Sequence, residues 1–244
     1  MAPAHLMTSL QQALTGPQLN LGGEEQAFSR GGNRLCFVHP RDPDLCIKVQ
    51  RPDRTPQQKR SERGFPKNLK PLSAFDDNAQ EFAVYRKIER HIGAPAFELT
   101  PFCHGYINTQ WGPGLCSQLI RDDDNRIAIT LKQYLWQQGK TPEILRLIAH
   151  FSQRWAALGM PSRKLLLHNI VLRQRDGKPH QLLVIDGLGW PDLLPLAWYL
   201  PALARHKARR RIADLDRAID ALLYKKEHQI DYGYHGWLEE DKRR

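Results

Sequence analysis

The sequence predicts an α+β protein, with strands concentrated early in the chain and helices in most of the second half. Short apolar runs separated by glycine and proline turns lie before residue 50, which indicates strands. Further along, apolar residues recur at spacings of three and four, which indicates helices. We divide the 244 residues into an arm or short helix at 1–18, a small β-rich part at 19–120 and a mainly helical part at 121–244 that ends with a basic helix.

The composition is that of a globular protein with a strong positive charge. Hydrophobic residues make up 41% of the chain, and the formal net charge is +10. Such a charge favours anionic partners, namely nucleotides, nucleic acid or acidic membrane surfaces, without choosing among them. The four cysteines are far apart and form no C-x-x-C pair, so neither a zinc site nor a disulfide framework is indicated.

The sequence contains no segment that predicts a membrane span or a secretory leader. The N-terminus lacks a basic start followed by an apolar core. The longest mainly apolar run, Leu193–Ala204, is interrupted by Pro195 and Pro201 and is too short to cross a bilayer. We therefore expect a cytoplasmic protein without a transmembrane segment.

A glycine turn and a strand lysine are the first candidate site residues. The turn is Ser29–Asn33, in which Ser29, Gly31 and Gly32 could fold backbone amides over a phosphate, and strands are predicted at 35–38 and 45–49. Lys48 lies within the second of these strands, where a partly buried ammonium group requires an anionic partner. The alternative is an edge-strand lysine that reaches water.

A helix is predicted over Asn78–Ile92. Phe82, Tyr85, Ile88 and Ile92 recur at helical spacing and define one apolar face. Glu81 lies at the edge of that face, so it can point toward the sheet that carries Lys48 and pair with it. The alternative is a solvated glutamate.

Two basic segments and one acidic turn have both structural and functional interpretations. Arg51–Lys70 predicts a loop that is either a solvated linker or an anion-binding flap. Arg205–Arg211 precedes a helix predicted at Ile212–Leu223 and is either a solvated helix face or a site for phosphate-rich partners. Nucleic acid is weakly supported because no aromatic residues alternate with these charges. The turn Asp122–Asn125 lacks the spacing of a calcium loop and is expected to be solvated.

The second half is predicted to contain two helices followed by a hairpin. The helices lie at Ile129–Gln138 and from Thr141 to Gly159. The hairpin has strands at Leu165–Leu172 and Gln181–Ile185, joined by a turn that contains Asp176, Gly177 and Pro179. Asn169 lies in the first strand and Asp186-Gly187 closes the second, so two oxygen ligands suited to magnesium can meet there. The alternative is an ordinary core hairpin.

The order of these features resembles the protein-kinase-like fold, with a small β-rich N-lobe and a mainly helical C-lobe. In that family a strand lysine paired with a helix glutamate holds the nucleotide phosphates, while an asparagine and an Asp-x-Gly aspartate hold magnesium. The resemblance implies that Lys48 and Glu81 are the phosphate-side pair, that Asn169 and Asp186 are the metal ligands, and that ATP and magnesium are the cofactors.

More narrowly, four short segments resemble the YrbL family of the PhoP regulatory network. They extend the resemblance from about Leu21 to about Leu223. In this sequence they read Lys48-Val49-Gln50, Glu81–Tyr85, His168–Leu172 and Val184–Gly189.

The chain departs from the kinase pattern at two places. Glycine follows Asp186 directly, where an aromatic residue normally intervenes. Lys164 stands five residues before Asn169, where the pattern has its catalytic aspartate, and an ammonium group cannot accept a hydroxyl proton until it is deprotonated.

The resemblance therefore implies a kinase-like nucleotide-binding protein whose catalytic loop is degenerate at Lys164. Lys164 either neutralises a transferred phosphoryl group, which permits ATP-dependent phosphotransfer to an unknown acceptor, or the site binds nucleotide without chemistry. The second class of function is a pseudokinase-type regulatory protein that recognises an anionic or protein partner through segments 51–70 and 205–211.

Overall fold

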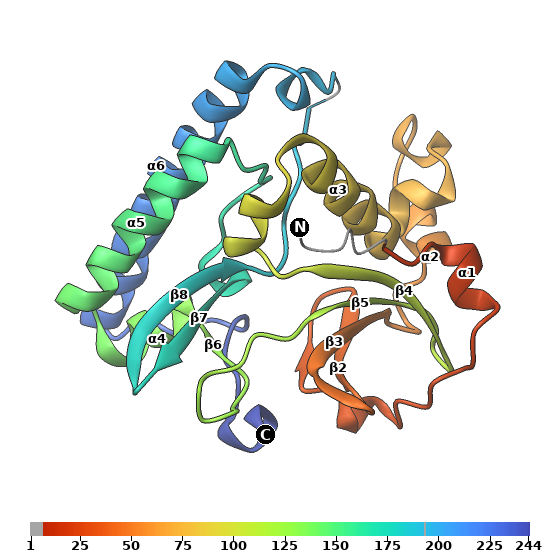
Figure 1. Cartoon of the computed structure of the whole chain (residues 1–244), viewed down its shortest axis with the longest axis horizontal. Coiled ribbons are helices and arrows are strands. Elements are labelled where there is room, and N and C mark those ends of the chain that lie inside the picture. Colours follow the sequence, from red (N-terminus) through yellow and green to blue (C-terminus); the bar gives the residue numbers. More distant parts are fainter. Residues whose placement is uncertain (1–6, 193) are drawn as a thin grey trace. The chain divides into compact units, whose positions relative to one another are not determined.

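The structure is a computed structural model that describes residues 7–192 and 194–244, and it consists of two compact units. Within the described chain, the first unit holds the residues up to Tyr85 together with Phe102–Leu119. The second unit holds Arg86–Pro101 together with the chain from Ile120 onward. The first is rich in strands and the second in helices, so the predicted α+β class is confirmed (Figure 1).

The first unit is built on a five-stranded antiparallel sheet with strand order β1-β2-β3-β5-β4. The strands predicted at 35–38 and 45–49 are confirmed within β2 and β3, whereas β4 was not predicted. The five strands are β1 (Ser29–Arg30), β2 (Arg34–His39), β3 (Asp42–Gln50), β4 (Cys103–Thr109) and β5 (Gly112–Gln118).

The register between β2 and β3 separates the two faces of this sheet. Cys36 lies opposite Lys48, and Arg34 lies opposite Gln50, so Arg34 and Lys48 share one face. The other face carries the buried core side chains Leu35, Phe37, Ile47 and Val49. One face is therefore apolar core, and the other holds charged residues.

Two short helices belong to the first unit, and one of them corrects a prediction. Within the arm predicted at 1–18, the structure has α1 (Leu10–Leu14), and residues 1–6 lie outside the described part. Arg51–Lys70 was predicted as a loop, but it contains α2 (Pro56–Ser61). Thr55 and Gln58 form a capping box and Pro56 occupies the first turn, so local capping starts a helix there.

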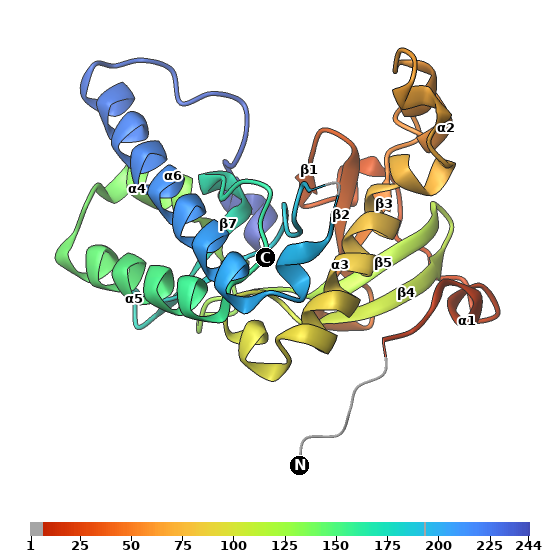
Figure 2. The same cartoon turned by 90° about the horizontal axis from the view of Figure 1, so that it is seen from above.

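The helix predicted at 78–92 is confirmed as α3 (Asp77–His91). Tyr85 and Ile88 are fully buried, as the apolar spacing predicted. Figure 2 shows α3 alongside β3 and β5, and Asn78 Nδ2 donates to the carbonyl oxygen of Lys48 over 2.9 Å. The start of α3 thus packs on the charged face of the sheet.

The second unit combines one short and two long helices with a three-stranded sheet of order β6-β7-β8 in its described residues. Figure 1 shows α5 running beside α6, and these two helices are in contact. No helix among the described residues is both long and apolar enough to span a membrane. The elements are α4 (Leu131–Gln138), α5 (Pro142–Leu158), α6 (Pro201–Glu227), β6 (Ile129–Thr130), β7 (Ile170–Arg175) and β8 (Lys178–Val184).

The predicted hairpin is present as β7 and β8, but with different boundaries. Its first strand starts at Ile170 rather than Leu165, and Asn169 closes a short 3-10 turn, Leu167–Asn169. Only Asp176 and Gly177 form the connection, with φ of 51° and 69°, so Pro179 lies within β8. A two-residue turn with both φ positive matches the twist of paired strands, which makes a longer loop unnecessary.

Two further predictions in the second unit were incomplete. The helix predicted at Ile212–Leu223 extends as α6 from Pro201, so the basic run Arg205–Arg211 is itself helical. Its buried face continues through Ala204 and Ala208, small residues that periodicity does not emphasise. The turn predicted as solvated at 122–125 contains a buried carboxylate, Asp122.

Candidate functional site

Lys48 and Glu81 form the ion pair that the sequence predicted. Lys48 Nζ donates to Glu81 Oε1 over 2.7 Å, and the two side chains are 8% and 7% exposed. Glu81 is on the first turns of α3, which packs on the face of β3 that carries Lys48. The alternative of a lysine that reaches water is excluded, because the charge is buried with a partner.

Arg34 and Asn78 also belong to this cluster, and sequence reasoning missed both. The Arg34 guanidinium group donates to Glu81 Oε2 and, over 3.2 Å, to Asn78 Oδ1. Asn78 lies one helical turn before Glu81, which is a signal that helix spacing could have supplied. The place of Arg34 in this cluster could be found only from the pairing register of β2 with β3. We call Arg34, Lys48, Asn78 and Glu81 the charged cluster.

The glycine turn lies in the same unit and is closed by backbone contacts. Gly31 N donates to the Arg34 carbonyl oxygen over 2.9 Å, so the turn joins β1 to β2. Arg51 Nη1 donates to the carbonyl oxygens of Gly31 and Gly32 over 3.1 and 3.2 Å. Arg51 therefore holds the turn, and phosphate binding by Ser29, Gly31 and Gly32 stays a prediction.

In the second unit, the three predicted residues Lys164, Asn169 and Asp186 meet around Gly187. A methyl group at Gly187 would lie 3.3 Å from Asn169 Nδ2 and 3.4 Å from the Lys164 carbonyl oxygen. Gly187 has φ of +79°, a conformation that glycine adopts without strain. The chain thus approaches itself closely here because this position has no side chain.

Backbone hydrogen bonds fix the same group of segments. Arg163 N donates to the Gly187 carbonyl oxygen and Ile185 N donates to the Asn169 carbonyl oxygen, each over 2.9 Å. Gly187 N donates to Asp186 Oδ1 over 2.6 Å, which orients the carboxylate. The Lys164 side chain is exposed to solvent. One amide and one carboxylate are therefore held near each other, with an exposed ammonium on the adjoining segment.

This donor set fits magnesium that is bound together with phosphate. The described residues contain no group of three His, Cys, Asp or Glu side chains placed to hold a metal ion. Magnesium does not need such a group, because it keeps several waters and takes one or two protein oxygens besides those of a nucleotide. Asn169 and Asp186 would supply those two protein oxygens.

The C-terminal segment packs against His168, the neighbour of Asn169, and sequence reasoning missed this contact. The rings of His168 and His235 lie 5.4 Å apart, and a methyl group at Gly236 would lie 2.5 Å from His168 Cβ. Thr130 Oγ1 donates to the Gly236 carbonyl oxygen over 2.6 Å. Glycine at 236 is therefore required for this close approach.

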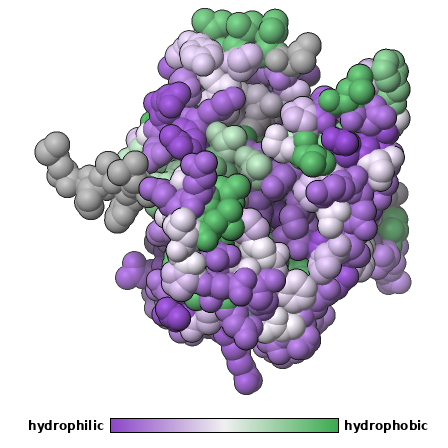
Figure 3. All heavy atoms as spheres, turned by 90° about the vertical axis from the view of Figure 1, so that its right-hand side faces the viewer, coloured by the Kyte–Doolittle hydropathy of each residue, from purple (hydrophilic) through white to green (hydrophobic). Residues whose placement is uncertain are grey.

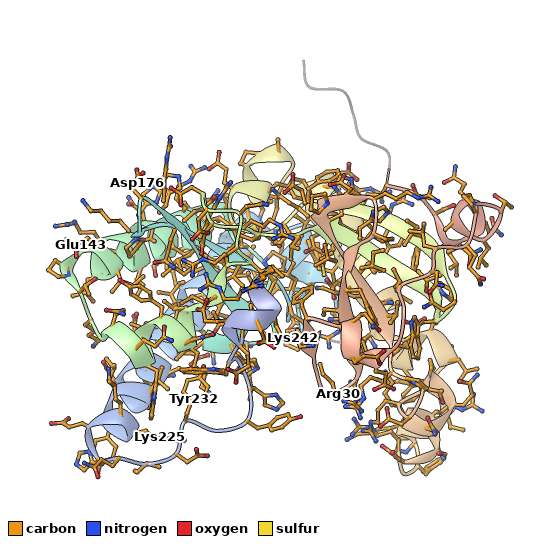
Figure 4. All side chains as sticks on the ribbon, turned by 90° about the horizontal axis from the view of Figure 1, so that it is seen from below. Arg30, Glu143, Asp176, Lys225, Tyr232 and Lys242 are labelled. Atoms are coloured by element: carbon orange, nitrogen blue, oxygen red, sulfur yellow. The ribbon has the colours of Figure 1, made fainter. Side chains whose placement is uncertain are left out.

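Lys132 also contacts this segment, which follows α6 in the chain. Its Nζ donates to the His235 carbonyl oxygen over 2.7 Å and lies 3.8 Å from the ring centre of Tyr232, labelled in Figure 4. Burial, His235 and Lys132 lower the pKa of His168, although Asp186 opposes this shift. His168 is accordingly a neutral packing residue at neutral pH, rather than a cation for phosphate.

The buried cysteines of the first unit are poorly suited to this chemistry. All four are free thiols, and three are buried in the sheet. Burial raises the pKa of Cys103 to about 12, although Lys48 opposes this shift. A thiol that stays protonated at neutral pH is a poor nucleophile and a poor metal ligand.

Comparison with known proteins identifies relatives over most of the chain. The family model described as PhoP regulatory network protein YrbL matches residues 20–220. The chain is also similar to proteins named "Uncharacterized protein YrbL" from Escherichia coli strain K12 and Shigella flexneri. Each is 24% identical over 184 residues, which covers 71% of this chain and 75% of the relative. The residues matched by the family model include the charged cluster and the segments around Gly187.

Proposed function

The chain belongs to the PhoP regulatory network protein YrbL family, and we propose that it binds a nucleotide with magnesium. The observation that carries this proposal is the buried Lys48–Glu81 pair at 2.7 Å. A buried ammonium is costly unless it is paired, and its retention on a sheet face is typical of a phosphate-binding lysine.

The charged cluster would hold the phosphate groups. An ammonium has three donors and a guanidinium has five, so Lys48 and Arg34 can donate to phosphate oxygens while they also hold Glu81. Glu81 would orient both cations. Asn169 and Asp186 would provide the protein ligands of the magnesium ion, which supplies charge neutralisation when bound.

Phosphotransfer is the further step in this proposal, and Lys164 determines its form. The Lys164 side chain is exposed, and an ammonium group has no lone pair with which to accept a hydroxyl proton. It can neutralise charge on a transferred phosphoryl group, and charge stabilisation with positioning accounts for much of the catalysis of phosphoryl transfer. The alternative is a site that holds nucleotide without transferring phosphate.

Thermal unfolding with and without ATP and magnesium tests nucleotide binding. At a ligand concentration a hundredfold above Kd, the free energy of unfolding should rise by about 2.7 kcal/mol. Asp186→Ala should lose this gain, and Asp216→Ala, an exposed carboxylate on α6, should keep it. No gain at millimolar nucleotide, or an equal gain in Asp186→Ala, contradicts the proposal.

Incubation with γ-labelled ATP, magnesium and cell extract tests transfer. Label transfer by the wild type makes Lys164 a working substitute for the aspartate. Transfer only by Lys164→Asp indicates a lost base, and absence of transfer by both, with binding intact, indicates a site that only binds.

A further inference from the structure

A group of large apolar side chains is exposed in the segment that leads into α6. Figure 3 shows hydrophobic atoms gathered at the top of the view, where this segment lies in Figure 1. The exposed fractions are 64% for Leu194, 50% for Leu196, 67% for Tyr199 and 50% for Leu200. Single exposed apolar residues are ordinary, but several in seven residues form a patch that needs an explanation.

This segment is held in place rather than loose. Leu196–Trp198 forms a 3-10 turn, and Ala197 within it is buried. The ring of Trp198 lies 5.8 Å from the His91 ring, and Lys87 Nζ lies 5.7 Å from the Trp198 ring centre. The Tyr199 ring also lies 5.2 Å from the His91 ring. The turn is therefore fixed to the end of α3 by Trp198 and one edge of Tyr199, while Leu196 and most of the Tyr199 side chain stay exposed.

A run of cations follows the apolar patch directly. Arg205, Arg209 and Arg210 are exposed on the first half of α6, and none of the three forms an ion pair with a described residue. Ala204 and Ala208 mark the buried side of the same turns. The sequence from 193 to 213 contains no aspartate or glutamate. We call residues 194–200 with Arg205, Arg209 and Arg210 the apolar–basic surface.

Leucine and tyrosine beside arginine match the chemistry of an acidic membrane. Apolar side chains enter the boundary between headgroups and acyl chains, while nearby arginines stay at the level of the lipid phosphates. Nucleic acid would use the arginines but gives the leucines no partner, because bases stack on aromatic rings. We propose that the apolar–basic surface docks the protein on a bilayer that contains anionic phospholipid.

Docking of this kind is peripheral and independent of the proposed nucleotide site. The apolar–basic surface shares no residue with the charged cluster or with Lys164, Asn169 and Asp186. Loss of nucleotide binding would therefore leave lipid binding unchanged, and each proposal can fail alone. Electrostatic attraction to the bilayer also predicts that binding weakens as salt screens the charges.

Sedimentation with phospholipid vesicles tests the proposal. The whole protein is mixed with vesicles of phosphatidylcholine alone or with about one third phosphatidylglycerol, and the bound fraction is measured from low salt to about 0.5 M NaCl. We expect binding to the anionic vesicles at least tenfold stronger than to neutral ones, with a steep loss at high salt.

Paired variants separate the apolar and the basic contributions. Leu196→Ser with Leu200→Ser, and Arg209→Gln with Arg210→Gln, should each lower the partition coefficient about tenfold or more. Arg209→Lys with Arg210→Lys should retain binding within about threefold because the charge is kept.

Two control variants in the same unit change exposed residues outside the apolar–basic surface. They are Leu145→Ser on α5, and Arg173→Gln with Arg175→Gln on β7. Each should change the partition coefficient less than twofold.

Three results would overturn the proposal. One is absence of sedimentation with anionic vesicles at low salt. Another is an equal loss in the control variants, which would indicate attraction by net charge alone. The third is binding to a short DNA duplex that competes vesicles away and persists in the leucine double variant, which would assign the surface to nucleic acid.

Discussion

Two ionic groups with a buried central residue, one taken from each unit, have opposite charge arrangements. In the first unit, Arg34 and Lys48 converge on the single carboxylate of Glu81. In the second unit, buried Arg243 lies between the buried carboxylate of Asp122, at 2.8 Å, and the carboxylate of Glu240, at 2.7 Å, whose side chain is 67% exposed. One group places two cations around an anion, and the other places two anions around a cation.

The remaining contacts of the two groups indicate different roles. Arg243 Nε donates to the Ile127 carbonyl oxygen, and Asp122 Oδ1 accepts from Gln174 N, so Arg243 ties the end of the chain to the turn before β6. The charged cluster instead places donor-rich side chains on a sheet face. Burial of charge alone therefore does not identify a ligand site, because the contacts of Arg243 give the second group a structural role.

The largest expected effect is on the charged cluster. Glu81→Ala removes the carboxylate that holds two buried cations, and loss of one partner of a buried pair typically costs about 3–5 kcal/mol. Urea unfolding should show this loss in free energy. A loss below about 1 kcal/mol would mean that Arg34 and Lys48 find other compensation, and the cluster would not be a preformed unit.

The second effect is on the C-terminal tie. Arg243→Met leaves Asp122 buried beside a methionine, and we expect a loss of about 3 kcal/mol in the free energy of unfolding. Adding Asp122→Leu should recover most of it, because the buried charge is then absent. If the double variant is as unstable as the single one, Arg243 stabilises through its backbone contact with Ile127 rather than through charge.

The pH dependence of unfolding measures how burial and ion pairing balance at Asp122. Burial raises the pKa of Asp122, the largest effect, although the Gln174 hydrogen bond and Arg243 oppose it. A raised folded-state pKa means that the folded protein binds the proton more tightly, so this contribution to stability falls as pH rises through the folded pKa.

Asp122→Asn should therefore be less stable relative to the wild type near pH 4, around the ordinary pKa of an aspartate, than at pH 7. Unfolding measured across this range provides the difference. If the difference shrinks in acid instead, the attraction of Arg243 outweighs burial.

A smaller effect on the free energy of unfolding is expected at Gly187, which lies beside the candidate magnesium ligands. Gly187→Ala should cost about 1–2 kcal/mol in unfolding, because φ of +79° is strained for alanine and the methyl group crowds Asn169. The change should also weaken nucleotide binding that depends on magnesium. Gly177→Ala, in the exposed β7–β8 turn with φ of +69°, provides the control for strain without that crowding.

The smallest effect is expected at an exposed ion pair. Lys140 and Asp220 lie 2.6 Å apart, but their side chains are 40% and 69% exposed. Lys140→Ala should change the free energy of unfolding by less than about 1 kcal/mol. A larger loss would show that exposure does not distinguish this pair from the two buried groups.

Local patterns predicted most of the secondary structure and part of the site. The apolar spacing of α3 and the capping signals of α5 lie within a few residues of each other in the chain, so they are readable without the fold. The Lys48–Glu81 pair was inferred for the same reason, since each residue has a face set by its own element. Asp186-Gly187 likewise comes shortly after the end of β8 at Val184.

The missed features depend on contacts between distant parts of the chain. Arg34 joins Glu81 only through the β2–β3 register and the packing of α3, and Asp122 joins Arg243 across most of the second unit. The packing of Gly236 on His168 is another such contact. The spacing of apolar residues in the sequence does not reveal these pairings, because they form only when distant elements pack together.

Calorimetric titration with ATP and magnesium tests most directly the central claim that Lys48 belongs to a nucleotide site. The titration compares substitutions of two buried lysines. Lys48 pairs with Glu81, and Lys59 pairs with Asp77 at 2.9 Å, so both are buried, paired and in the first unit. We predict saturable binding by the wild type, a loss of at least tenfold in Lys48→Met, which is about 1.4 kcal/mol, and an unchanged Kd in Lys59→Met. Absence of binding by the folded wild type at millimolar nucleotide, or an equal loss in both variants, would contradict the account.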